Sequence, residues 1–288
     1  MIPSSFAKPK TSKEMKTLEQ TIAKMERGAA QSLRKHLAAV GINDWTDITR
    51  STLYDLKDHL GEAVAASTAK QVLSNLRAVM NRVKDEADFP ADFAKILAVK
   101  ATAPMKTYLT EDELALLENA PTHTAKQLFV KNVFIICAYT GLRVSDAINL
   151  TPENIVDGCL HFVAQKTKKA GAIPLKSGLA ERIAWVASHP DKKVTLMSYN
   201  RAVRKLCKDA GICDEVVVFK AGKEMKGPKW KFVSSHTARI STASCLNRRG
   251  VPIGDISKLL QHSGVQMTER YIIRDHIQLS SNAMKFFR

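Results

Sequence analysis

Apolar residues in the first hundred positions recur with the spacing of helices. One apolar stripe, whose members lie three or four positions apart, predicts a helix over residues 17–40. A second stripe predicts a helix over 48–60 that ends at Gly61, and a third predicts a helix that begins at Ser67 and is broken by Pro90. Because every element in this stretch is helical, the pattern indicates a small all-helical bundle.

A short stretch of different composition follows the bundle. Residues 101–108 combine small residues with a proline and a lysine, which is typical of a linker. We therefore expect one domain over 1–100 and a second over 109–288. The second domain opens with a clear helix start, because Thr110 is followed three positions later by Glu113, the spacing of a capping box.

The second domain mixes helical and strand patterns. The apolar run over 128–142 predicts a buried helix, and helical patterns resume from Thr237 to the end. Between them, two apolar segments joined by a basic turn predict an antiparallel hairpin over 158–175. The apolar segments 216–219 and 230–233 predict another strand pair across a loop rich in glycine and lysine. The expected fold is mainly α-helical with a small antiparallel β-sheet, divided into two domains.

The charge of the chain narrows the choice of partners. The 288 residues carry a net charge of +16, of which residues 1–100 contribute +4 and the remainder +12. This excess predicts a polyanionic partner, either a nucleic acid or an anionic membrane surface. No apolar run reaches the ~18 residues of a membrane-spanning helix, and the start of the chain has no apolar signal segment. We therefore expect a cytoplasmic protein without a membrane partner. The sequence has five cysteines and no CxxC pair, which indicates neither a disulfide framework nor a zinc site.

The second domain contains residues suited to phosphate chemistry. Arg143 comes just after a glycine turn at Gly141, and His236 and Arg239 lie three residues apart, on one face of a predicted helix. Tyr271 follows His262 by nine residues. The sequence has no carboxylate cluster for Mg²⁺, no HExxH motif, no phosphate-binding P-loop and no GxSxG motif. A set of arginines and imidazoles beside a phenol can stabilise a phosphodiester transition state while the tyrosine acts as the nucleophile.

The order and spacing of these residues resemble the catalytic domain of the tyrosine recombinases, the phage integrase family. The resemblance covers about residues 109–273, and its SSHTAR and QKTKK segments are most similar to integrases of bacterial mobile elements. It implies a two-domain clamp on DNA, with the N-terminal helices as the core-binding domain and the second domain as the catalytic one. It implies the catalytic set Tyr271, Arg143, Lys166, His236, Arg239 and His262.

The resemblance also implies a reaction. Tyr271 attacks the scissile phosphate, a 3′-phosphotyrosyl link forms, and the 5′-oxygen leaves with a proton from Lys166. The two arginines and His236 hold the phosphate, and His262 assists. Because the covalent link conserves the energy of the broken bond, neither a metal nor ATP is expected as a cofactor. Lys168 is the main competitor of Lys166 for the role of general acid.

Several further residues are expected near the DNA. Asp146, three positions after Arg143, is expected to support that arginine. The family usually has glycine before its second histidine, whereas this chain has Gln261; glycine is favoured there if the turn needs a positive φ. Four lysines are expected as contacts to the DNA backbone: Lys168, Lys169, Lys226 and Lys229.

The resemblance implies double-stranded DNA with specific recombination sites as the partner and a homo-tetramer on two duplexes as the assembly. It also allows accessory DNA-bending proteins as further partners. An apolar stripe within residues 277–288 is expected to dock on a neighbouring protomer, with packing on its own domain as the alternative. Two other functions stay open. One is a topoisomerase-like or resolvase-like enzyme that uses the same chemistry, and the other is a non-catalytic DNA-binding regulator.

Overall fold

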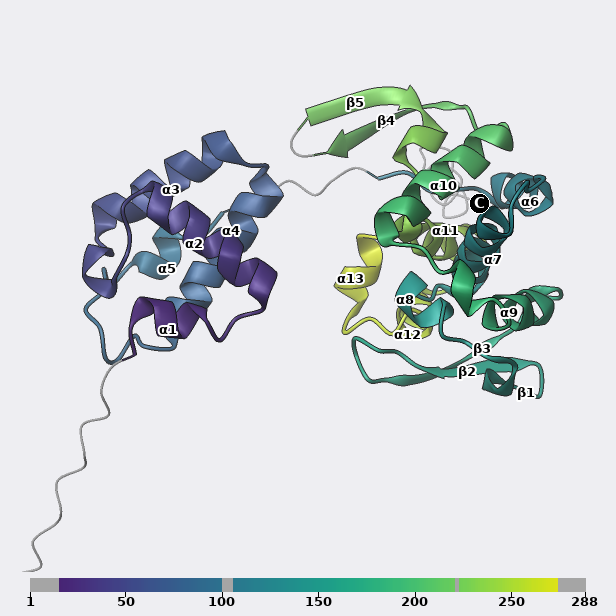
Figure 1. Cartoon of the computed structure of the whole chain (residues 1–288), viewed down its shortest axis with the longest axis horizontal. Coiled ribbons are helices and arrows are strands. Elements are labelled where there is room, and N and C mark those ends of the chain that lie inside the picture. The colour runs from purple at the N-terminus through teal and green to yellow at the C-terminus, as the bar shows by residue number, and fades with distance from the viewer. Residues whose placement is uncertain (1–15, 100–105, 221–222, 274–288) are drawn as a thin grey trace, which may run out of the picture. The chain divides into compact units, whose positions relative to one another are not determined.

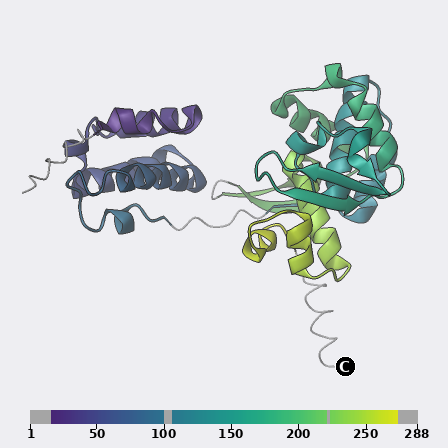
Figure 2. The same cartoon turned by 90° about the horizontal axis from the view of Figure 1, so that it is seen from below.

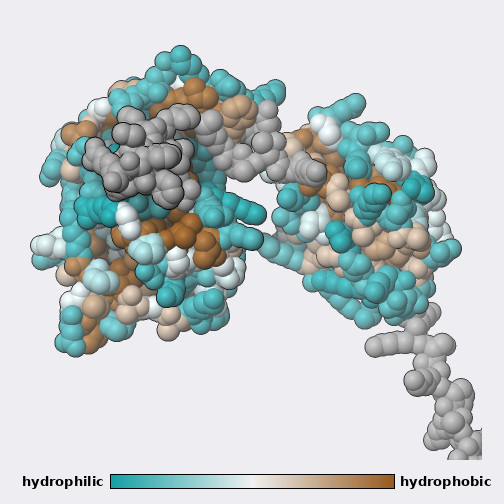
Figure 3. Space-filling model, turned by 180° about the vertical axis from the view of Figure 1, so that it is seen from behind, coloured by the Kyte–Doolittle hydropathy of each residue, from teal (hydrophilic) through white to brown (hydrophobic). Residues whose placement is uncertain are grey.

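The computed structural model of the chain describes residues 16–99, 106–220 and 223–273. The chain divides into two compact units, Met1–Ala103 and Pro104–Arg288, which are described separately (Figure 1). In the view of Figure 3, both units present a largely hydrophilic surface interrupted by hydrophobic areas. None of the helices in the described ranges is long and apolar enough to cross a membrane.

The first unit is a bundle of helices around one apolar core, as the sequence pattern predicts (Figure 2). Leu33, Leu53 and Leu76 come from three different helices and are fully buried in this core. The helices are α1 (Leu18–Ile22), α2 (Arg27–Ala39), α3 (Arg50–Ala63), α4 (Ala66–Asn81) and α5 (Phe93–Ile96), with a short 3-10 helix η1 (Trp45–Asp47) between α2 and α3.

Three predicted helices in this unit have wrong boundaries, and the third of them, expected to run until Pro90, is α4, which ends at Asn81. The helix predicted over 17–40 is two helices, because Glu26 has an extended backbone with ψ of 137° and starts α2 afresh. Both helices place their apolar residues in the same core. The helical spacing of these residues therefore continues across the break, and the sequence pattern does not reveal it. The helix predicted to end at Gly61 runs on to Ala63, since Gly61 does not adopt the positive φ of a helix-ending glycine.

The second unit is larger and mixes helices with two small antiparallel sheets (Figure 1). Its helices are α6 (Glu111–Asn119), α7 (Ala125–Thr140), α8 (Val144–Ala147), α9 (Leu179–Ala187), α10 (Leu196–Asp209), α11 (Ser235–Arg248), α12 (Ile253–Leu259) and α13 (Val265–Glu269), with 3-10 helices η2 (Pro152–Asn154), η3 (Pro190–Lys192) and η4 (Lys229–Phe232). Its strands are β1 (Ile155–Val156), β2 (Cys159–Val163), β3 (Ala170–Pro174), β4 (Glu215–Lys220) and β5 (Lys223–Pro228).

Helix α7 is the buried helix that the apolar run predicts, and it packs closely on α11 in the core of the unit. Small residues on α11, among them Ala238, Ser241 and Ser244, are fully buried and let the two backbones approach each other. The Thr242 hydroxyl donates a hydrogen bond of 2.8 Å to the Ala138 carbonyl of α7. This pairing matters for function because α11 carries two of the predicted catalytic residues.

The two strand pairs differ in how well the sequence predicts them. The first hairpin is confirmed, since β2 pairs with β3 and Leu160 lies opposite Ile173. The second is wrong in its partner: β4 pairs with β5, so Val217 lies opposite Lys226, whereas the predicted strand 230–233 falls mostly within the 3-10 helix η4. The lysine-rich stretch that looked like a loop is a strand with little burial, which explains why its apolar pattern was weak.

The structure also shortens the predicted linker. Thr107 and Tyr108, which the sequence placed in the linker 101–108, are buried in the second unit. The next residue, Leu109, donates its backbone N–H to the Ser241 hydroxyl on α11 at 2.8 Å. The segment that leads into α6 is therefore part of the second unit and lies against the helix that carries His236.

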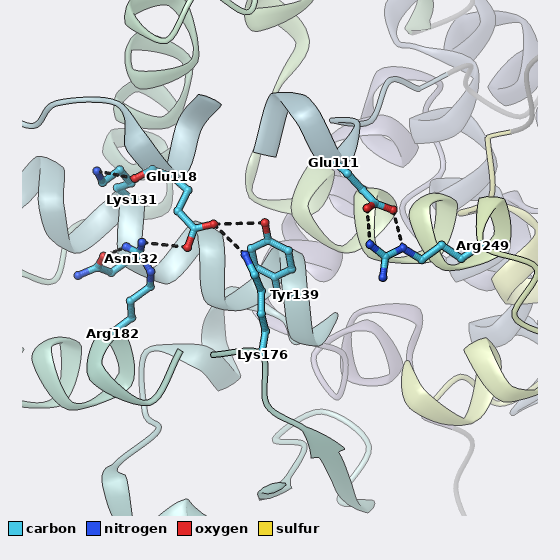
Figure 4. Close-up of polar contacts among 8 residues, drawn as sticks. All are labelled: Glu111, Glu118, Lys131, Asn132, Tyr139, Lys176, Arg182 and Arg249. Carbon is cyan, nitrogen blue, oxygen red and sulfur yellow. Dashed lines mark hydrogen bonds and ion pairs between the residues drawn. The ribbon is translucent and has the colours of Figure 1, made fainter. Parts of the chain in front are cut away.

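A polar cluster joins α6, α7 and α9 on one side of this unit (Figure 4). One carboxylate, that of Glu118, accepts hydrogen bonds from Lys176 Nζ at 3.0 Å, Arg182 Nη2 at 3.0 Å and the Tyr139 hydroxyl at 3.3 Å. Although burial opposes it, the contacts with these two cations lower the pKa of Glu118. Lys131 donates to the Glu118 carbonyl at 3.1 Å, so its buried ammonium is a helix cap rather than a binding group.

Candidate active site

Predicted catalytic residues from separate parts of the sequence meet in the second unit. Helix α7 ends at Gly141, whose φ of 72° is left-handed, and the chain then places Arg143 at the N-terminal cap of α8. His236 and Arg239 lie in the first turns of α11, so their spacing of three residues puts them on one face. Arg143, His236 and Arg239 line a common cavity of about 400 Å³.

Tyr271 lies among these groups. Its ring centroid is 4.9 Å from that of His236 and 4.7 Å from that of His262. Two cations lie near the same ring: Arg239 Cζ at 5.9 Å and Lys106 Nζ at 5.4 Å from the centroid. A phenol next to two imidazoles and two cations is suited to nucleophilic attack on an anionic phosphate.

Arg239 is almost completely buried, with 4% of its surface exposed. Its guanidinium donates to the Gly141 carbonyl at 2.5 Å and to the Leu260 carbonyl, so it joins the ends of α7 and α12. Its Nε has no hydrogen-bond partner among the residues that the structure describes. Burial and the neighbouring charge of Arg143 lower the pKa of Arg239 to about 10, which leaves the group charged at neutral pH.

His262 is fixed by a residue that the sequence analysis did not identify. Its Nδ1 lies 2.9 Å from the Thr268 hydroxyl, and its side chain is buried. Within the described ranges its Nε2 has no partner. Burial, together with the charges of Arg239 and Arg143, lowers the pKa of His262 to about 4, so the ring is neutral at neutral pH. A neutral ring that accepts from Thr268 at Nδ1 carries its proton on Nε2 and can donate it to a phosphate oxygen.

His236 lies near the same two arginines as His262, but its side chain is exposed to solvent. Desolvation of the ring by the surrounding atoms and the positive charges of Lys106, Arg239 and Arg143 lower its pKa to about 4. Desolvation and the neighbouring cations therefore keep both histidines neutral at neutral pH.

We expect both rings to titrate far below an ordinary histidine. Between pH 8 and about 5.5, the C2–H NMR signals of His236 and His262 should hardly move, because their pKa values lie near 4. Since these values lie below the ordinary 6.5, the two rings stabilise the folded protein above pH 6.5, and this stabilisation is lost as the pH falls toward 4. The urea-unfolded protein is the control, and native midpoints near 6.5 would contradict the description of the site.

Lys166, the predicted general acid, stands apart from this cluster. Lys166, Lys168 and Lys169 are exposed on the turn between β2 and β3. Across the described part of the chain, no hydrogen bond, ion pair or ring contact joins Lys166 to Tyr271. The side-chain hydrogen bond of Asp146 goes to this turn rather than to Arg143: its Oδ1 accepts from the backbone N–H of the residue before Lys166, at 3.0 Å.

Two of the lysines expected to contact DNA are engaged elsewhere. Lys229 is buried, and its ammonium lies 2.6 Å and 2.7 Å from the two carboxylate oxygens of Glu113, so the prediction of a phosphate contact there is wrong. Charge alone could not show this, because the partner lies 116 residues away in the sequence. Lys226 is exposed on β5 and lies 3.0 Å from Glu215 in a solvent-exposed ion pair, which leaves it accessible to a phosphate.

The sequence profile of the phage integrase family matches residues 107–276. The chain belongs to the phage integrase family. The described ranges contain no group of three or more His, Cys, Asp or Glu side chains that could hold a metal ion.

Two curated relatives and one solved structure illustrate this membership. The integrase of Escherichia phage P2 is 35% identical over 86 residues, which cover 30% of this chain and 24% of the relative. The integrase of Enterobacteria phage P21 is 25% identical over 253 residues, covering 83% of this chain and 64% of the relative. Thus the chain spans less than two thirds of either relative. A lambda integrase fragment (75–356), solved as a dimer bound to a COC' core site, shares the fold with a TM-score of 0.64 at 19% identity over 88% of this chain and 92% of that one.

Three residues of the integrase-family site escaped the sequence analysis. Lys106 was assigned to the linker, and Thr268 and Ser244 carry no catalytic signature of their own. The Ser244 hydroxyl donates to the Tyr271 carbonyl at 3.2 Å and accepts the N–H of Ile273 at 3.0 Å, which fixes the backbone around the tyrosine. Thr268 lies on α13, which begins only after His262, so their separation of six residues gives no helical signal in the sequence.

Proposed function

We propose that this integrase-family protein performs site-specific DNA recombination by cleaving and rejoining strands through a 3′-phosphotyrosyl intermediate. The observation that carries the proposal is the position of Tyr271, whose ring contacts His236, His262 and the Arg239 guanidinium at once. Tyr271 is partly buried and packs against the apolar cluster of Ala243, Ile256 and Leu260, so this packing holds the phenol beside the two imidazoles and the buried cation. Relatives named as integrases support the same function.

The proposed chemistry uses each group once. The Tyr271 oxygen attacks the scissile phosphorus, its proton passes to the neutral imidazole of His236, and the bond from phosphorus to the 5′-oxygen breaks. Lys166 donates the proton that the leaving 5′-oxygen needs. Arg143 and Arg239 stabilise the charge on the non-bridging oxygens, and His262 donates from Nε2. Attack by the 5′-hydroxyl of another strand reverses these steps and reseals the DNA without a metal or ATP.

The substrate we propose is double-stranded DNA with a specific recombination site. The solved lambda integrase dimer is bound to a core site, and the net charge of +16 suits the same class of partner. Exposed Lys168 and Lys169 on the β2–β3 turn are proposed to contact the DNA backbone. A homo-tetramer on two duplexes is the proposed assembly, with accessory DNA-bending proteins as further partners, acting on a mobile element in the bacterial cytoplasm.

The predicted docking segment 277–288 lies outside the described residues. We propose that it docks on a neighbouring protomer, because burying two phenylalanines and a leucine at ~1.5–3 kcal/mol each favours a stable contact. Deleting 277–288 should then leave binding to a single DNA site nearly intact while abolishing the pairing of two duplexes, as measured by gel shift and recombination assays. Loss of a cooperative thermal melt in the truncated protein would instead assign the segment to its own domain.

A product assay tests the proposed function. Supercoiled plasmid carrying two copies of the recombination site from the ends of the protein's own mobile element, called the core site below, should yield recombinant circles when incubated with the protein in EDTA and without ATP. Relaxation of supercoils without recombinant circles would favour a topoisomerase-like enzyme. DNA binding without any change in the plasmid would favour a non-catalytic regulator.

A further inference from the structure

Gln261, the residue before His262, has an unfavourable backbone. Its φ is 52°, in the left-handed region where a side chain crowds the backbone and where glycine is favoured. The position is the turn that ends α12, and its N–H donates to the Lys258 carbonyl at 2.9 Å. Glycine at this position would make the same turn without the strain, so the turn itself does not explain the glutamine.

The side chain of Gln261 adds a second cost. It is buried, with 8% of its surface exposed, and neither Nε2 nor Oε1 of its amide has a hydrogen-bond partner among the described residues. A buried amide without a partner is rare in native structures. Two unfavourable features at one residue beside a catalytic histidine indicate a functional role for the side chain.

The neighbouring strand makes room for this amide. A Cβ atom at Gly171 on β3 would overlap Gln261 Nε2 and would lie 3.0 Å from Phe162 Cζ. The absence of a side chain at Gly171 is therefore what allows the glutamine to reach over the β2–β3 pair. The contact joins the turn before His262 to the hairpin whose tip carries Lys166.

A complementary acceptor lines a narrow gap beside Gln261, which is too small to hold a water molecule. Asp146 and Gln261 both border it, together with Arg239. Asp146 Oδ1 accepts the backbone N–H of Gln165, whereas its Oδ2 has no partner in the described ranges. A carboxylate oxygen can only accept and an amide Nε2 can only donate, so the two unpartnered atoms suit each other.

We infer that Gln261 is a positioning residue for the proton-donating step: its amide donates to Asp146 Oδ2 and thereby fixes the turn that presents Lys166 to the leaving 5′-oxygen. With both oxygens bonded, Asp146 would connect the backbone of Gln165 to the turn before His262. Lys166 follows Gln165 directly, so the position of that backbone sets where its ammonium can reach. The inference rests on the proposed function, in which Lys166 is the general acid.

Two variants separate the hydrogen-bonding role of the Gln261 amide from the volume of its side chain. Gln261→Gly removes the side chain and suits the left-handed backbone, and Gln261→Met keeps the bulk against Gly171 but has no donor. Gln266→Ala, at an exposed position of α13, is the matched control. Each full-length protein is assayed in single turnover on a nicked duplex carrying the core site. The scissile 5′-bridging atom is oxygen in one substrate and sulfur in the other, because a thiolate leaves without needing a proton.

We expect Gln261→Gly and Gln261→Met to cleave the oxygen substrate at least about tenfold more slowly than wild type, a part of the range of general acid catalysis. Both should cleave the sulfur substrate at the wild-type rate, bind the duplex normally and melt cooperatively, with Gln261→Gly at least as stable as wild type. Gln266→Ala should match wild type on both substrates.

Three results would overturn the inference. Equal slowing on both substrates would show that the amide supports the phosphate-binding cluster as a whole. Wild-type cleavage by Gln261→Met, with slow cleavage by Gln261→Gly, would show that the glutamine only fills space. Wild-type rates in both variants would show that it has no role. If wild-type protein forms no adduct on either substrate, the proposed function itself has failed and the inference falls with it.

Discussion

Replacing Tyr271 with phenylalanine will leave DNA binding intact and abolish covalent attachment to DNA. The ring that packs between His236 and His262 remains, so the fold of the site should be unchanged. Only the nucleophilic oxygen is lost, and the cleavage rate should fall by at least about 10⁴-fold, the scale of the loss when a nucleophile is removed. Gel electrophoresis under denaturing conditions measures the adduct, and a gel shift measures binding.

Tyr139→Phe is the matched control for this experiment. The Tyr139 hydroxyl donates to Glu118 in the polar cluster of α6, α7 and α9, apart from the residues around Tyr271, so its removal should leave cleavage unchanged. A denaturation-resistant adduct formed by Tyr271→Phe would assign the nucleophile to another residue. Loss of DNA binding by Tyr271→Phe would mean that the phenol serves structure rather than chemistry.

The second large effect concerns the proton donor. Lys166→Ala should lose a large part of the ~10²–10⁴-fold that general acid catalysis contributes. Because a sulfur leaving group needs no proton, a duplex with sulfur at the scissile 5′ position should largely restore cleavage by this variant. Single-turnover cleavage of the oxygen and sulfur substrates measures both effects.

Lys168→Ala decides between the two neighbouring lysines. Lys168 has a left-handed backbone with φ of 55°, and its N–H closes the turn by donating to the Ala164 carbonyl at 2.8 Å. We therefore expect Lys168→Ala to weaken DNA binding modestly and to gain nothing from the sulfur substrate. Rescue of Lys168→Ala by sulfur, without rescue of Lys166→Ala, would reverse the assignment.

Local sequence patterns predicted the parts of the site that depend on short spacings. The capping box of Thr110 and Glu113 forms as expected, with hydrogen bonds of 2.7 Å and 3.2 Å. Likewise, the three-residue spacing of His236 and Arg239 places both on α11 because a helix brings such positions to one face. The family resemblance predicted which distant segments form the site together, and the spacing of apolar residues holds no such information.

Features that depend on distant partners could not be predicted in this way. Lys229 looked like one of several surface lysines until the fold paired it with Glu113. Lys106 looked like part of a linker, and its approach to Tyr271 follows from the packing of residues 107–109 against α11. The partner of strand β4 was misassigned because β5 is almost entirely exposed and so lacks an apolar pattern.

Gln261 shows how a departure from a family pattern becomes informative only in three dimensions. The sequence indicated that a positive φ would favour glycine, and the structure confirms the positive φ at 52° while retaining the glutamine. Neither the space above Gly171 nor the unpartnered oxygen of Asp146 can be read from the sequence.

Mapping the covalent adduct tests the central claim most directly. Wild-type protein is incubated with a nicked duplex carrying the core site, the complex is digested with protease, and the DNA-linked peptide is identified by mass spectrometry. The account predicts a single adduct in which the Tyr271 oxygen is joined to a 3′-phosphate, with a free 5′-hydroxyl on the released strand. An adduct on any other residue, a link to a 5′-phosphate, or strand cleavage without an adduct would contradict it.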